Sequence, residues 1–136
     1  MKRFELIEHT ADIGLRAYGK NLGEAFGNAA YGLFSIITDL RKVRKAESRV
    51  VVLQEKSPED LLYSWLNHLI YLFDAQQILL KQFEIKKFDG QKMKAICYGE
   101  IADLSRHEIK IGVKAATFYM LKVDVDKNEV EVIFDI

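Results

Sequence analysis

The chain carries almost none of the residues that constrain a backbone covalently or locally. One cysteine, Cys97, among 136 residues excludes an internal disulfide and a zinc site built from several cysteines. Pro58 is the single proline, and no Gly/Ser-rich linker divides the chain. We therefore expect residues 1–136 to form one domain, which is the usual outcome at this length, with Cys97 as a buried, inert thiol.

The chain also lacks an excess of charge and a long hydrophobic run. Twenty Lys and Arg residues balance twenty Asp and Glu residues. Proteins that bind nucleic acid by bulk attraction usually show a basic excess, so this class is disfavoured, although a local basic patch is compatible with the balance. No apolar run reaches the length of a membrane span, and the N-terminal residues do not resemble a signal peptide. We expect a cytoplasmic protein without membrane contact.

The residues that are present alternate between two hydrophobic periods. Spacings of three and four predict one helix after Asn21, ending near residues 38–39, and a second from Pro58 to about Asp74. Strands are predicted over residues 4–8, 13–18, 50–53, 79–88, 93–102, 113–125 and 129–134. The pattern predicts an α+β fold in which two amphipathic helices pack on a mainly antiparallel or mixed β-sheet.

Two local signals support the helices. Asn21 is a typical N-cap, with Glu24 at the reciprocal position of a capping box, and Ser57 followed by Pro58 is a second helix start. The second helix is apolar nearly all round, so we expect it either to be deeply buried or to offer one face to a partner.

The most polar segment near the N-terminus is residues 9–14, with the sequence HTADIG. His9 and Asp12, closed by Gly14, predict a tight bend between two strands. One interpretation is a simple turn in which Thr10 and Asp12 bind loop amides. The alternative makes Asp12 a metal ligand, with His9 supporting it or contacting a ligand.

Asp135 gives a second carboxylate at the opposite end of the chain. Because the final strand is apolar up to Phe134 and Ile136, we expect it to be docked. If the terminal strands pair, Asp12 and Asp135 meet, and a backbone carbonyl and the terminal carboxylate add further oxygens. Oxygen ligands of this kind suit Ca²⁺, Mg²⁺ or Mn²⁺.

Two other polar segments have simpler interpretations. The basic stretch over residues 41–49 is typical of a solvated face, and the alternative is a contact surface for RNA phosphates or an acidic partner. Arg106, His107 and Glu108 predict a solvated loop, in which His107 is a candidate for contact with a partner or ligand. No Ser/His/Asp order and no phosphate-binding loop is legible.

Several segments together resemble the archease family. They cover essentially the whole chain in the same order and spacing: HTADIG at 9–14, GEAF at 23–26, LYSWLNHL at 62–69, YGE at 98–100, VKAATFY at 113–119 and Asp135-Ile136. The chain departs from the pattern at Tyr119 and Met120, where many members have a His and a further polar residue. Phe134 stands where a Pro is frequent.

The resemblance implies a function that the composition does not. Archeases act as protein cofactors or chaperones of the RtcB-type RNA ligase in tRNA splicing. They promote guanylylation, the transfer of GMP from GTP to a ligase histidine, and multiple turnover. The chain is then not itself an enzyme, needs no organic cofactor, and contacts RNA at most indirectly. In the family, the residues matching Asp12, Asp135 and Ile136 hold a divalent cation, with Asp39 as a further candidate.

Two alternatives from other classes stay open at this point. One is a metal-dependent hydrolase that uses the same carboxylates, with His9 as acid or base. The other is a small RNA-binding module that uses the basic residues 41–49.

Overall fold

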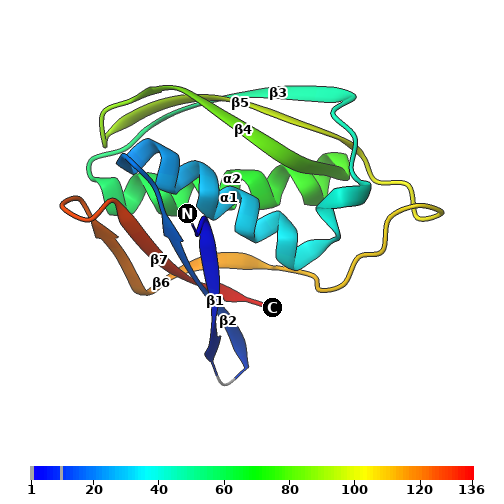
Figure 1. Ribbon diagram of the computed structural model, residues 1–136, viewed down its shortest axis with the longest axis horizontal. Coiled ribbons are helices and arrows are strands. Elements are labelled where there is room, and N and C mark those ends of the chain that lie inside the picture. The colour runs from blue at the N-terminus through cyan, green and yellow to red at the C-terminus, as the bar shows by residue number, and fades with distance from the viewer. Residues whose placement is uncertain (1, 10) are drawn as a thin grey trace.

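Two antiparallel sheets enclose a pair of helices in the computed structural model, which describes residues 2–9 and 11–136, without the side chains of Glu8 and His9 (Figure 1). The four-stranded sheet has the order β1-β2-β7-β6, and the three-stranded sheet has the order β3-β5-β4. The bounds are β1 Phe4–His9, β2 Asp12–Tyr18, α1 Leu22–Ile37, β3 Glu47–Gln54, α2 Pro58–Gln76, β4 Ile78–Phe88, β5 Lys92–Ile101, β6 Ala115–Asp124 and β7 Glu129–Asp135, with a short 3₁₀ helix, η1, at Leu40–Lys42.

The predicted α+β fold, with two helices on antiparallel strands, is confirmed, and the strands form two separate sheets. The strands divide into two sheets, and α1 and α2 lie between them (Figure 1). The physical reason is the apolar surface of the helices. Twelve of the sixteen residues of α1 are buried, so one covering sheet is not enough. In α2, the buried residues from Leu61 to Leu72 follow the three-four spacing of one wide face, and Tyr71 on the other side is 58% exposed.

The helix ends follow the local sequence signals. Asn21 caps α1 by accepting a hydrogen bond from the Glu24 N–H at 2.8 Å, and Ser57 caps α2 by accepting from the Asp60 N–H at 3.1 Å. The Glu24 carboxylate accepts from the main chain of Lys20 at 3.2 Å, one residue before the position expected for a capping box. Each cap satisfies a helix N–H that has no partner inside the helix.

The C-terminal end of α1 holds the irregular segment between β5 and β6. Thr38 ends the helix, and its hydroxyl donates to the carbonyl of Glu108 at 2.7 Å. The Lys110 N–H donates to the carbonyl of Ile37 at 2.7 Å. These bonds satisfy groups at the end of α1 and fix residues 103–114, where the predicted strand over 113–125 starts only at Ala115.

The core is built from large side chains on both helices and on the inner faces of the sheets. Trp65 of α2 is fully buried, and its indole N–H donates to the carbonyl of Phe26 in α1 at 3.0 Å. Cys97 of β5 is fully buried, and this burial raises the pKa of its thiol to about 12, so the predicted inert thiol is confirmed. Within the described ranges, neither helix combines the length and hydropathy that crossing a bilayer demands.

Candidate functional site

Two carboxylates from opposite ends of the chain face each other across β2 and β7. These strands pair antiparallel, with Asp12 opposite Asp135 and Ile13 opposite Phe134. The strand pairing on which the meeting of these two carboxylates depends is therefore present. Side chains directly opposite in an antiparallel pair have Cβ atoms about 4.5–5.5 Å apart.

Both carboxylates project from the outer face of the four-stranded sheet. Leu15 of β2 and Val132 and Phe134 of β7 are buried against the helices. Because side chains alternate along a strand, Asp12 and Asp135 lie on the opposite face, which is open to solvent. This face is where a soluble partner could reach them.

The neighbours of the acidic pair, by which we mean Asp12 and Asp135, differ between its two sides. Gly14 follows Asp12 in β2, and Ala115 of β6 lies opposite Asp135, so these two neighbours are small. On the other side, His9 of β1 lies opposite Asp12 in the strand register. Asp135 is exposed to solvent and Asp12 is half-buried.

The acidic pair has no cationic partner among the described ion pairs. Arg16, on the same outer face, is held instead by Glu5 and Glu131, with Tyr18 donating to Glu5. The hydrogen bond from Tyr18, followed by those from Lys2 and Arg16, lowers the pKa of Glu5 to about 2. The guanidinium of Arg16 is therefore already paired with Glu5 and Glu131.

Like charges directly opposite each other destabilise a sheet by roughly 0.2–1 kcal/mol, and a bound cation would remove that cost. Within the described part of the chain, no three His, Cys, Asp or Glu side chains converge on one point. A cation at the acidic pair would therefore take its remaining ligands from main-chain oxygens, such as that of Ile136, and from water. The carbonyl of Asp135 already accepts from the Lys114 N–H at 2.8 Å. The position of Lys114 beside Asp135 is not predictable from the sequence, because it depends on the pairing of β6 with β7.

The bend before the acidic pair differs from the predicted one. Gly14 lies inside β2 and does not close the turn; the positive backbone angle falls on Ala11, with φ of 125°. Such an angle is uncommon for a residue other than glycine. Thr10 and the side chain of His9 lie outside the described residues, so the expected roles of these two residues stay predictions.

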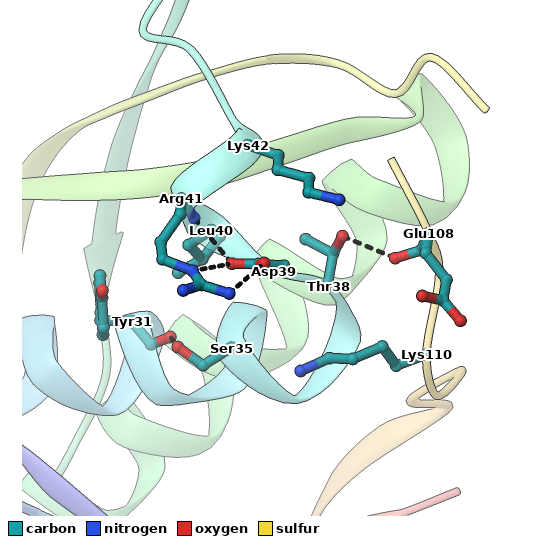
Figure 2. Close-up of a pocket in the computed structure, with 9 residues that line it drawn as sticks. All are labelled: Tyr31, Ser35, Thr38, Asp39, Leu40, Arg41, Lys42, Glu108 and Lys110. Atoms are coloured by element: carbon teal, nitrogen blue, oxygen red, sulfur yellow. Dashed lines mark hydrogen bonds and ion pairs between the residues drawn. The ribbon is translucent and has the colours of Figure 1, made fainter. Parts of the chain in front are cut away.

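Asp39, the further candidate for a cation ligand, is the N-cap of η1 (Figure 2). Its carboxylate accepts from Nε of Arg41 at 3.0 Å and from the second guanidinium nitrogen, Nη2, at 2.9 Å. These bonds lower the pKa of Asp39 to about 2. The cleft beside it has a volume of about 430 Å³, and neither Asp12 nor Asp135 lines it. The carboxylate of Asp39 is thus already paired with Arg41, and its expected role as a further cation ligand stays a prediction.

The solvated loop predicted around His107 is wrong for His107 itself, which is 3% exposed. Its Nδ1 accepts from the Asp103 N–H at 2.9 Å, so the ring proton is on Nε2, which lies 3.1 Å from both the carbonyl of Lys42 and a carboxylate oxygen of Glu100. Both ring nitrogens are used inside the protein, and His107 is no longer a candidate for contact with a partner.

Comparison with known proteins shows which family the chain resembles. A model of the archease protein family matches residues 4–136. The chain is 42% identical to an archease of Pyrococcus abyssi, over 91% of this chain and 89% of that protein. It is 39% identical to an archease of Sulfurisphaera tokodaii, over 94% and 93% of the two chains. The chain belongs to the archease family.

Solved structures of related proteins have the same fold. A solution structure of a Methanobacterium thermoautotrophicum protein covers all of both chains at 37% identity, with a TM-score of 0.82. The crystal structure of a Thermotoga maritima archease, described as a possible chaperone, has a TM-score of 0.64 over 96% of this chain and 94% of that one. At 22% identity the latter supports the archease fold alone.

Proposed function

We propose that this protein activates an RtcB-type RNA ligase in tRNA splicing and is not itself the ligase. In this account it promotes the transfer of GMP from GTP to the ligase histidine and allows the ligase to turn over repeatedly. Membership of the archease family over residues 4–136 supports the proposal. Accessory proteins act through a partner, and the acidic pair lies on an open sheet face that a partner could reach.

The observation that carries the chemistry is the placement of Asp12 directly opposite Asp135. We propose that these two carboxylates and a main-chain oxygen of Ile136 hold a divalent cation, which is Ca²⁺, Mg²⁺ or Mn²⁺ by its oxygen ligands. A bound cation of this type screens phosphate charge. The residues themselves contribute negative charge without an internal cationic partner among the described ion pairs.

The test is GMP loading of a cognate RtcB-type ligase, with GTP and a limiting divalent cation, in the presence and absence of this protein. We expect faster and more complete loading when the protein is added, and several rounds of RNA joining per ligase. Unchanged loading of a ligase that is active alone would overturn the proposal. Hydrolysis of a phosphoester by the purified protein without ligase would favour the metal-dependent hydrolase instead.

A further inference from the structure

A second charged surface lies between η1 and the segment that follows β5. Four cationic side chains and one hydroxyl line a cleft of about 480 Å³: Arg41, Lys42, Arg44, Arg106 and Ser105. No acidic residue lines it. The cleft shares Arg41 and Lys42 with the neighbouring cleft around Asp39, where Lys42 and Lys110 stand on opposite sides (Figure 2). We call these five lining residues the basic cleft.

The fold holds the two halves of the basic cleft together through one buried carboxylate. Glu100, 7% exposed, accepts from the main-chain N–H of Arg44 at 2.7 Å and from the guanidinium of Arg106. His107, described above, adds a bond from its ring to the same carboxylate and another to the carbonyl of Lys42. Segments 41–44 and 105–106, far apart in the sequence, therefore present their cations at fixed positions.

The basic cleft keeps cationic charge that the protein does not neutralise. Arg41 and Arg106 are paired with Asp39, Glu100 and Asp103. Neither Lys42 nor Arg44 takes part in any ion pair that the structure describes, and both side chains are exposed. Lys42 and Arg44 thus lack an acidic partner among the described ion pairs, and they lie beside Arg41 and Arg106, which ion pairs hold. This arrangement is suited to binding an anion.

We propose that the basic cleft binds the phosphate backbone of single-stranded RNA. Guanidinium forks and hydroxyl groups are suited to phosphate oxygens, and such contacts position a nucleic acid without reading its sequence. Four cationic side chains along one cleft fit several phosphates of a chain better than one isolated anion. The choice of RNA as the polyanion rests on the proposed ligase function and goes beyond the indirect RNA contact that the sequence favours.

This assignment predicts weak, sequence-independent and salt-sensitive binding. The whole chain has no net charge, so it offers RNA no bulk attraction, and binding through this cleft depends on local charge alone. Each phosphate contact to a single strand contributes a slope of about −0.7 in a plot of log K against log salt. Three or four contacts therefore predict a total slope of about −2 to −3, from the same principle.

The experiment is a fluorescence anisotropy titration of a labelled oligouridylate with the full chain at several salt concentrations. The double variant Lys42→Ala/Arg44→Ala removes the two cations that lack an acidic partner and keeps the main-chain bonds. Lys92→Ala/Lys94→Ala is the matched control, because both lysines are exposed at the start of β5, whereas the cleft residues Ser105 and Arg106 follow the end of this strand. We expect the cleft variant to bind roughly tenfold more weakly at low salt, with a slope smaller by about 1.4, and the control to bind like the wild type.

Three results would overturn the assignment: no RNA binding by the wild type, equal losses in the cleft variant and the control, or cleft substitutions that weaken ligase association and leave RNA binding unchanged. Chemical-shift changes on adding RNA to the unsubstituted protein give an independent check. They should concentrate at residues 41–44 and 105–106. GMP loading measured without RNA should be unaffected by the cleft variant, so failure here and failure of the proposed ligase function remain distinguishable.

Discussion

Neutralising one member of the acidic pair should have opposite effects on stability with and without a divalent cation. Asp135→Asn keeps the shape of the side chain and removes one of two like charges that face each other across β2 and β7. Without a cation, repulsion between the two carboxylates lowers the stability of the wild type by roughly 0.2–1 kcal/mol, as for like charges directly opposite each other. In a chelator, the variant should therefore be more stable than the wild type by up to about 1 kcal/mol.

With the cation present, the order should reverse. A ligand at a hundred times its dissociation constant stabilises the native state by about 2.7 kcal/mol. At this chain length, 1 kcal/mol corresponds to a shift in melting temperature of roughly 4 °C, so the wild type should gain about 10 °C. The variant has lost a ligand and should gain little.

Differential scanning calorimetry in EDTA and in excess Ca²⁺, Mg²⁺ or Mn²⁺ measures both quantities. Asp126→Asn is a suitable control, because Asp126 is an exposed carboxylate in the turn between β6 and β7. It should respond to the cation as the wild type does. The reasoning is refuted if Asp135→Asn is less stable in EDTA and still gains the full cation-dependent increment.

Three further predictions follow from single residues. Gly99→Ala should lower the free energy of unfolding by more than about 4 kcal/mol in urea denaturation, or prevent folding, because its Cβ would lie 1.7 Å from the carbonyl oxygen of Leu79; a small loss would contradict the packing of β4 on β5. Cys97 should react with a thiol reagent only as fast as the protein unfolds, because it is fully buried and its pKa is raised to about 12. Burial alone would raise the pKa of Glu100, but the Arg106 guanidinium and the Arg44 N–H outweigh it and lower the pKa to about 2. The stabilisation from Glu100 should thus be complete above pH 4.5 and lost as the pH falls toward 2, and Glu100→Gln should remove this part of the acid-unfolding profile; an unchanged profile would contradict the role given to the carboxylate.

Features encoded within a few residues were predictable from the sequence. Asn21 and Ser57 are the N-caps of α1 and α2, as their side-chain chemistry indicates. Alternation along β7 puts Val132 and Phe134 on one face of the strand, and the structure buries both. Because Asp135 is next in this alternation, its place on the outer face follows from the same local pattern.

Features that depend on distant partners were not predictable. The residues around His107 in the sequence do not predict its burial. His107 is buried next to the Glu100 carboxylate and the Lys42 carbonyl, and only the folded chain places these groups beside its ring. The division into two sheets is likewise a matter of strand partners: β5 lies between β3 and β4, whereas β6 pairs with β7. Strand length and hydropathy do not encode this choice.

The turn before Asp12 shows a further limit. The sequence predicts that Gly14 closes this bend. In the structure, Gly14 lies within the β1–β2 pair in close approach to Ile7, and Ala11 takes the positive backbone angle. Glycine permits both close packing and turning, and the sequence alone does not distinguish the two uses.

The measurement that tests the central claim most directly is the rate of GMP transfer to the cognate ligase, compared between the wild type, Asp12→Ala and Lys92→Ala at limiting divalent cation. If the acidic pair serves the ligase through a cation, Asp12→Ala should fold normally and lose the stimulation, whereas Lys92→Ala should retain it. Full stimulation by Asp12→Ala would contradict the account.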